Sequence, residues 1–310
     1  MLQVLAITAP IFIIIALGYW AARLGLLSLE QIRGIGIFVI TFALPALVIK
    51  ALAQRPIGEV LNPHYLMAYA GASMASFGAG FYWFRRMRGA DLQSSAIAAM
   101  GMSVSNSAYI GYPVAVMAAG APAVVALALG MLVENLLMVP LALALAEIGR
   151  QPGASSLGLV LGTLKRLGKN PLIVSISLGL CLSLLQVPLP VPVFKVIDML
   201  SMASAPAALF VIGGVLYSTR VRGQFNEIAI IGTGKLLVHP LLLGLGFLIV
   251  GDIEPAMMLA GLILAAAPMM SVYPILGQRY GQEGRCAAAL VLTTLTSFFT
   301  LSALLVIARW

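Results

Sequence analysis

Two long apolar stretches of this chain are broken by glycine and proline, at matching places in its two halves. The first break reads NSAYIGYP at residues 106–113, and the second reads APMMSVYP at residues 267–274. The two Tyr-Pro pairs lie 161 residues apart, as do Pro45 and Pro206. Proline removes a backbone donor and clashes with the preceding helical turn, so neither stretch is expected to form one continuous helix. Interruptions at corresponding positions of two repeats are typical of the binding site of a secondary transporter.

The composition indicates a protein that lies mostly in lipid. Hydrophobic residues make up 61% of the chain, the mean hydropathy is +1.06, and only 9% of residues are charged, against roughly 25% in soluble domains. The net charge of +8 is spread over short loops, a pattern that sets membrane orientation and does not indicate nucleic-acid binding. No basic segment precedes the first apolar stretch, residues 4–20, so we interpret it as a retained span and not as a signal peptide.

Ten stretches are long enough to be membrane spans, which need about 20 mostly apolar residues. They cover approximately residues 3–22, 34–53, 64–84, 93–118, 122–146, 170–187, 194–217, 228–250, 255–279 and 286–308. We expect two five-span halves, residues 1–146 and 170–310, joined by a polar linker at residues 147–169. Because each half has an odd number of spans, the second half must cross the membrane in the opposite sense. The 161-residue offset therefore predicts an all-α protein built as an inverted repeat.

The loops that follow odd-numbered spans, called here the odd loops, carry most of the basic residues. They hold Arg23, Arg33, Arg85, Arg86, Arg88, Arg150, Lys165, Arg166, Lys169, Arg220, Arg222, Arg279 and Arg285. The opposite side holds Lys50, Arg55, Lys195 and Arg309. Because the more basic short loops face the cytoplasm, this asymmetry predicts that both termini lie outside the cytoplasm.

The two broken segments are expected to lie inside the protein, since unwound backbone at membrane depth is tolerated only there or beside water. Pro113 and Pro274 each suit the first position of a new helix, whose free N–H groups would attract an anion such as a carboxylate. The predicted substrate-binding residues are Ser105, Asn106, Ser107, Tyr109, Tyr112, Pro113, Ser271, Tyr273 and Pro274. Alternatively, each Ser or Tyr only re-satisfies backbone groups that the break frees. Asn106 favours the site, because its amide both donates and accepts hydrogen bonds.

Four polar residues within spans are candidate charge or coupling groups. Glu134, beside Asn135 in span five, could carry a coupling proton, help to hold a cation, or form a protonated contact between helices. Lys235 and His239 share one face of span eight at i, i+4. Lys235 could extend to the headgroups, attract an anion or pair with Glu134, whereas His239 is expected to form a structural contact. The hydroxyls of span ten could face the site or bond to carbonyls of their own helix; they are Thr293, Thr294, Thr296 and Ser297.

Several classes of protein are disfavoured. Cys181 and Cys286 lack the spacing of a zinc site, and we interpret both as buried free thiols. The chain has no Walker loop, so ATP is not expected to be the direct energy source. We expect no metal or other cofactor, and a proton or sodium ion as the coupling ion if transport is coupled. An enzyme that uses Ser105 or Ser107 with His239 finds no support in any catalytic motif, and a receptor would need a signalling domain.

The break in span four resembles a motif of the auxin efflux carrier family of bacteria and plants. The family pattern is Gly-Asn-x-x-(aromatic)-(Ile/Leu)-Gly-x-Pro, and residues 105–113 read SNSAYIGYP, with serine in place of the leading glycine. AAP at residues 266–268 is similar to the family's Ala-(Ala/Ser)-Pro in span nine. KLLVHP at residues 235–240 is similar to its Lys-Leu-hydrophobic-x-Pro in span eight, with one extra residue. The resemblance extends over essentially the whole chain.

This resemblance implies ten spans, with spans 1, 2, 6 and 7 as a scaffold. Spans 3–5 and 8–10 would form a transport domain that moves like an elevator, with spans 4 and 9 crossing at its centre. It also implies a bacterial inner-membrane protein that carries a small carboxylate. Bacterial members with Glu-Asn in span five, as at residues 134–135 here, are often assigned as malonate or malate carriers. The scaffold spans could also support a homodimer.

The leading hypothesis is therefore a secondary carrier of a small organic anion, such as the dicarboxylate malonate. The long central loop of the plant members and their Asn-Pro-x-x-Tyr pattern are not present in the sequence, which disfavours auxin itself. The alternative is an exporter of an auxin-like aromatic or another monocarboxylate. An anion channel is less favoured, because internal inverted repeats are not a typical channel architecture.

Overall fold

The computed structural model describes residues 2–53, 61–150, 171–186, 189–218, 225–278 and 280–308. Residues 151–169 of the predicted linker lie outside this part of the chain, as do the odd-loop residues Arg220, Arg222 and Arg279 and, on the opposite side, Arg55 and Arg309. In the described residues all regular structure is helical, apart from one isolated antiparallel bridge between Ser105 and Met269. The prediction of an all-helical protein is confirmed.

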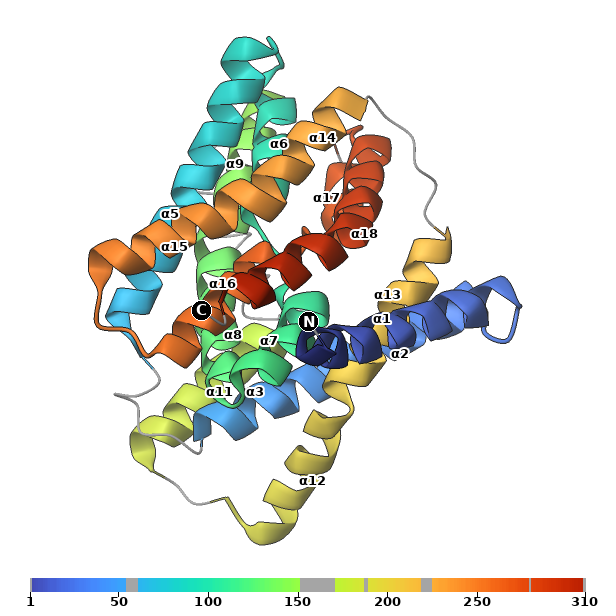
Figure 1. Cartoon of the computed structure of the whole chain (residues 1–310), viewed down its shortest axis with the longest axis vertical. Helices are drawn as coiled ribbons and strands as arrows, with labels where there is room; N and C mark the ends of the chain where they lie inside the picture. The colour runs from blue at the N-terminus through green and yellow to red at the C-terminus, as the bar shows by residue number, and fades with distance from the viewer. Residues whose placement is uncertain are drawn as a thin grey trace.

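The described helical residues follow the predicted spans closely (Figure 1). In chain order the elements are α1 (Leu2–Arg23), α2 (Leu29–Phe38), η1 (Val39–Ala43), α3 (Leu44–Ala53), α5 (Pro63–Tyr82), η2 (Trp83–Met87), α6 (Leu92–Ser103), η3 (Ser107–Gly111), α7 (Tyr112–Ala119), α8 (Pro122–Val133), η4 (Glu134–Met138), α9 (Val139–Arg150), α11 (Pro171–Leu185), α12 (Val191–Met202), α13 (Ser204–Ser218), α14 (Phe225–Thr233), η5 (Gly234–Val238), α15 (His239–Val250), α16 (Pro255–Ala266), α17 (Tyr273–Gln278) and α18 (Glu283–Ile307). The η elements are π-helical turns.

Prolines explain most of these π-helical turns. Four of them, η1, η3, η4 and η5, each end two residues before a proline; these prolines are Pro45, Pro113, Pro140 and Pro240. A proline within a helix clashes with the carbonyl one turn earlier, and a wider π turn relieves such crowding without ending the helix. The apolar stretches therefore bend at these prolines and continue.

The position of Pro113 differs from its prediction, because the π-helical turn before this proline lets the helix continue through it. It was expected to begin a new helix, but that helix begins at Ser107, and Pro113 lies within it just after η3. The unwound residues of the first break are Val104 to Asn106, and those of the second are Ala267 to Val272. Pro274 is the second residue of α17, close to its expected position.

By length and composition alone, five helical stretches in the described residues could cross a membrane. They are Leu29–Ala53, Pro122–Arg150, Val191–Tyr217, Phe225–Val250 and Glu283–Ile307. Shorter apolar helices are Ile13–Arg23, Ser107–Ala119, Pro171–Leu185 and Pro255–Ala266. The chain thus has the elements of a polytopic membrane protein, and the number of crossings remains a prediction.

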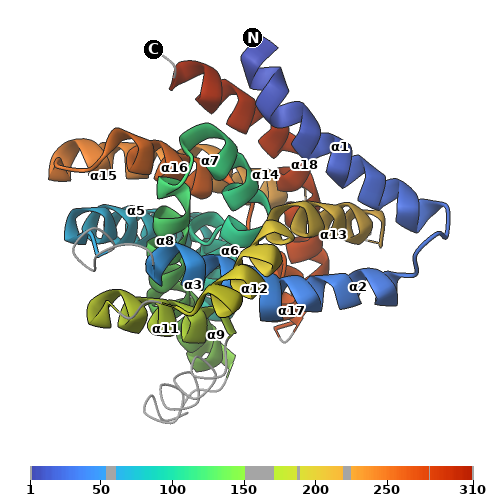
Figure 2. The same cartoon turned by 90° about the horizontal axis from the view of Figure 1, so that it is seen from below.

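The helices pack in two groups, and Figure 2 shows α1, α13 and α2 of one group side by side. In the first, called the outer group, α1 and α2 pack on α13, and α3 packs on α11 and α12. In the second, called the crossing group, α5 packs on α6 and α15, α6 packs on α9, α16 packs on α7 and α8, and α18 packs on α14 and α17. Each group combines helices from both halves of the sequence.

Glycines allow the closest contact within the outer group. A Cβ atom on Gly213 would collide with the carbonyl oxygen of Ile15, and one on Gly18 would collide with that of Phe210. Backbones of α1 and α13 therefore touch, as small residues permit in membrane helices.

One buried-thiol prediction is wrong. Cys286 is buried, but Cys181 is exposed. The buried residues of α11, such as Ile176 and Gly179, face α3, and Cys181 lies on the opposite side of that helix.

Candidate functional site

The two broken segments cross and hydrogen-bond to each other at the centre of the crossing group. The Asn106 N–H donates to the Pro268 carbonyl at 2.7 Å, and Ser105 pairs with Met269 in the antiparallel bridge. The Asn106 side-chain amide donates to the Ser271 hydroxyl oxygen at 2.7 Å. Part of the unwound backbone of one break is thus satisfied by the other, as buried backbone requires.

A glycine brings the crossing helices together. A Cβ atom on Gly111 would lie 3.0 Å from Cδ2 and 3.3 Å from Cα of Leu264. The helix that begins at Ser107 can therefore lie directly against α16, which brings the start of one half-helix beside the end of another. Such a helix start presents backbone N–H groups and a partial positive charge.

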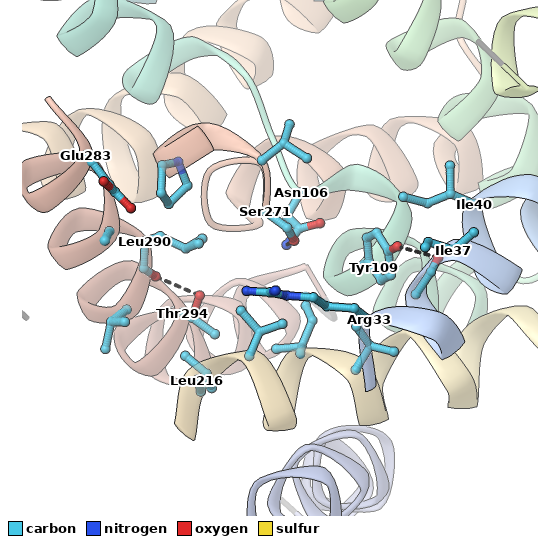
Figure 3. A pocket seen from close by; sticks show the side chains of 18 of the residues that line it. Arg33, Ile37, Ile40, Asn106, Tyr109, Leu216, Ser271, Glu283, Leu290 and Thr294 are labelled. Atoms are coloured by element: carbon cyan, nitrogen blue, oxygen red, sulfur yellow. Dashed lines mark hydrogen bonds between the residues drawn. The ribbon is translucent and has the colours of Figure 1, made fainter. Parts of the chain in front are cut away.

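A cavity of about 960 Å³ opens beside the crossing (Figure 3). Its walls come from α2 and η1, from both broken segments, from α13 and from α18. Most of the lining is aliphatic. The polar and charged lining residues are Arg33, Thr41, Asn106, Tyr109, Ser271, Glu283 and Thr294. An apolar cavity with a few convergent polar groups is the usual form of a small-molecule site.

Four of the nine predicted substrate-binding residues line this cavity: Asn106, Tyr109, Ser271 and Pro274. Asn106 directly precedes η3 and is 3% exposed, and its amide is fixed by Ser271 (Figure 3). The Tyr109 hydroxyl donates to the Gly36 carbonyl at 3.1 Å, which joins the crossing to α2.

The other five predicted residues do not line the cavity. The Ser105 backbone N–H and the Ser107 hydroxyl donate to Glu134, and the Tyr273 hydroxyl donates to the Ile97 carbonyl of α6 at 3.0 Å. Tyr112 and Pro113 are buried beyond the break. Tyr273 therefore bonds to a carbonyl inside α6, and not to a backbone group that either break frees.

Glu134 lies behind the crossing, with its carboxylate surrounded by donors. Oε1 accepts from the Tyr69 hydroxyl at 2.9 Å, the Ser105 N–H at 3.1 Å and the Ser107 hydroxyl at 2.9 Å. The side chain is only 3% exposed and does not line the cavity. Asn135 points elsewhere, since its amide donates to the Met131 carbonyl of the same helix. Glu134 therefore contacts the first broken segment from behind and does not line the cavity itself.

Lys235 is fully buried and does not extend to the headgroups. Its ammonium donates to the Ala265 carbonyl, at the end of α16, and lies 3.1 Å from Nδ1 of His239. Nε2 of His239 lies 3.1 Å from the Ser73 hydroxyl oxygen, as expected of a structural contact. A cation at the carbonyl end of a helix is favourable. The structure gives no ion pair between Lys235 and Glu134 among the described residues.

The hydroxyls of span ten bond to their own helix. Thr293, Thr294, Thr296 and Ser297 each donate to a carbonyl three or four residues earlier in α18. Thr294 also lines the cavity. Among the described residues, no group of three or more His, Cys, Asp and Glu could hold a metal ion.

Sequence reasoning missed three polar lining residues: Arg33, Thr41 and Glu283. Arg33 was assigned to a loop, although it lies in α2. A signal was present, because Arg33, Ile37 and Ile40 recur at helical spacing and all three line the cavity.

Comparison with known proteins identifies the family of this chain. A family model described as "Membrane transport protein" matches residues 4–305. A protein of Rhizobium meliloti (strain 1021) named "Putative malonate transporter" is 29% identical over 313 residues, which cover all of this chain and 97% of that protein. The chain therefore belongs to the membrane transport protein family, the auxin efflux carrier family, and is an integral membrane transporter and not an enzyme.

Proposed function

We propose that this protein is a secondary carrier of a small organic anion, a dicarboxylate such as malonate, which binds in the cavity at the crossing. The observation that carries this proposal is the position of Asn106. Its amide lines the cavity at the start of a half-helix, where neutral donors and the helix dipole favour an anion. The name of the Rhizobium meliloti relative supports malonate as the first substrate to test.

The proposed architecture is ten spans in two inverted repeats, residues 1–146 and 170–310, in a bacterial inner membrane. Packing supports this, because the outer group contains predicted spans 1, 2, 6 and 7 and the crossing group contains the other six. We propose that the crossing group moves against the outer group like an elevator and that both termini lie outside the cytoplasm. A homodimer through the outer group is compatible with this motion.

We also propose that Glu134 couples transport to a cation gradient. An ionisable group within a membrane protein is a functional candidate by default. Glu134 is hydrogen-bonded to Ser105 and Ser107, which flank Asn106, so a change in its charge would act directly on the broken segment. Lys235 and His239 would then support the end of α16 on the other side of the crossing.

The test is uptake of radiolabelled malonate by proteoliposomes, comparing wild type with Asn106→Ala. Loss of one hydrogen bond to a charged ligand should raise the half-saturating malonate concentration about tenfold or more. Asn226→Ala is a matched control, because Asn226 is exposed on α14 and does not line the cavity. Undiminished uptake by Asn106→Ala would remove the crossing from the binding site. Flux that does not saturate would indicate a channel, and uptake of monocarboxylates alone would favour the alternative carrier.

A further inference from the structure

Arg33 is positioned in the cavity by the start of α2. The Ser28 hydroxyl accepts from the Gln31 N–H at 3.2 Å, and the Gln31 side chain accepts from the Ser28 N–H at 2.8 Å. This reciprocal cap fixes where the helix begins. Arg33, Ile37 and Ile40 consequently share the face of the bent α2–η1 helix that lines the cavity.

The guanidinium of Arg33 is available to a ligand. Figure 3 shows its side chain extending from α2 across the cavity, beside Asn106 and Ser271 and towards Thr294. Among the described residues, no hydrogen bond or ion pair to Arg33 is found. Two other basic residues form ion pairs: Arg285 pairs with Glu227 at 3.0 Å, and Lys50 pairs with Asp198 at 2.5 Å.

Among the described residues, the charged residues that line the cavity are Arg33 and Glu283, which have opposite signs. Glu283 lies in the first turn of α18, on a different wall from Arg33 (Figure 3). The charges of the described lining residues therefore balance, with no excess of positive charge among them that would concentrate every anion. Within this part of the lining, selection between anions would come from where Arg33 is placed relative to the neutral donors of the crossing.

A dicarboxylate has a second carboxylate that needs a partner, which a monocarboxylate does not have. One carboxylate can be held by Asn106 and the helix start, as proposed above, but the second would remain as an uncompensated charge beside an aliphatic wall. A guanidinium binds a carboxylate through two parallel hydrogen bonds, which a lysine ammonium cannot reproduce. Arg33 is the described residue of the cavity that can supply this contact.

We propose that Arg33 binds the second carboxylate of the substrate and makes the cavity selective for dicarboxylates over monocarboxylates. This inference rests on the proposed function and extends it to a specificity-determining residue. It also has a geometric consequence. Arg33 belongs to the outer group, whereas Asn106 and Ser271 belong to the crossing group, so one dicarboxylate contacts both groups at once.

The experiment compares wild type, Arg33→Gln and Arg33→Lys with the matched control Arg23→Gln. Arg23 is an exposed odd-loop arginine that does not line the cavity, so its substitution removes the same charge from the same predicted side. For each purified protein, malonate and propionate affinities are measured by ligand-dependent thermal unfolding, and malonate uptake is measured in proteoliposomes. Unfolding without ligand reports whether each variant is folded.

We expect Arg33→Gln to lower the affinity for malonate about tenfold or more, as loss of a charge-assisted contact predicts. The affinity for propionate should change less than about twofold. Arg33→Lys should recover part of the malonate affinity, and Arg23→Gln should match wild type. An equal loss of affinity for both ligands, or no change in either affinity, would overturn the role of Arg33 while leaving malonate transport established. Absence of malonate binding and uptake in wild type would overturn the proposed function, and this inference with it.

Discussion

Glu134 shows how one residue supports the crossing from behind. Its Oε1 atom accepts hydrogen bonds from Tyr69, Ser105 and Ser107, and two of these donors flank Asn106. Among the described residues, Oε2 accepts only the longer bond from Ser107, at 3.2 Å. A glutamine can keep the first oxygen and replace the second by an amide nitrogen, whereas an alanine leaves all three buried donors unpaired.

Glu134→Gln and Glu134→Ala should therefore differ in stability. Each buried donor left without a partner costs about 1–3 kcal/mol, so alanine should lower the free energy of unfolding by about 3 kcal/mol or more. Glutamine should remain near wild type but lose the dependence of uptake on an imposed pH or sodium gradient. Thermal unfolding and uptake with and without each gradient measure the two effects. Gradient dependence that persists in Glu134→Gln would show that another group couples transport.

Only part of the residue-scale arrangement follows from sequence. Asn106, Tyr109, Ser271 and Pro274 could be found because glycine and proline mark the breaks. The sequence could not predict which of these side chains face the cavity, since the rotation of an unwound segment follows no helical period. Ser107 turns to Glu134 because that carboxylate needs donors, and this contact spans 27 residues of sequence.

At the scale of elements, glycines set how closely the helices of the crossing group approach. A Cβ atom on Gly101 of α6 would lie 2.6 Å from the Tyr273 hydroxyl, which donates to Ile97. Gly78 of α5 has no atom within 4 Å of such a Cβ. These two glycines of neighbouring helices therefore form a matched pair of test positions.

Gly101→Ala should displace Tyr273 and lower the free energy of unfolding by about 1–3 kcal/mol, the usual cost of overpacking. Gly78→Ala should leave the free energy of unfolding unchanged or raise it slightly, because alanine is the better helix former. Thermal unfolding in detergent measures both. Equal melting temperatures for the two variants would mean that α17 does not pack on α6 through this contact.

The start of α6 gives a pH-dependent prediction outside the membrane. The Asp91 carboxylate accepts from the Ser94 N–H at 2.6 Å, and this hydrogen bond holds the pKa of Asp91 below its ordinary value of 3.8. A depressed folded-state pKa adds stability above the ordinary value, and that stability is lost as the pH falls through the folded pKa. Asp91→Ala should cost about 1 kcal/mol at neutral pH.

The difference in stability between wild type and Asp91→Ala should therefore shrink as the pH is lowered from about 6 to about 3. Unfolding measured across that range provides the check, with Asp91→Asn as a control that can retain the cap without the titration. A difference that grows on acidification would contradict the assigned hydrogen bond.

For the whole molecule, sequence predicted where helices form more reliably than how they assemble. Apolar length and proline position account for the helical stretches and their π turns. The pairing of α1 with α13 and of α3 with α11 joins residues far apart in sequence, and no local pattern specifies it. The helical spacing of Arg33 with Ile37 and Ile40 indicates a shared face, but that this face lines the cavity depends on α2 lying beside the crossing.

Membrane orientation is a further prediction at this scale. In a Cys181→Ala background, Met87→Cys lies at the end of η2 near the predicted cytoplasmic side, and Leu185→Cys lies at the end of α11 near the opposite side. Both parent residues are exposed. A membrane-impermeant thiol reagent added to intact cells should label position 185 and not position 87. The reverse pattern would place both termini in the cytoplasm.

The account depends most on an anion binding at the crossing of the two broken helices. Anomalous diffraction from crystals of the protein soaked in bromomalonate would locate the ligand directly. We predict a bromine peak inside the cavity, with one carboxylate at Asn106 and Ser271. A peak elsewhere, with the cavity at the crossing empty at saturating ligand, would contradict the account.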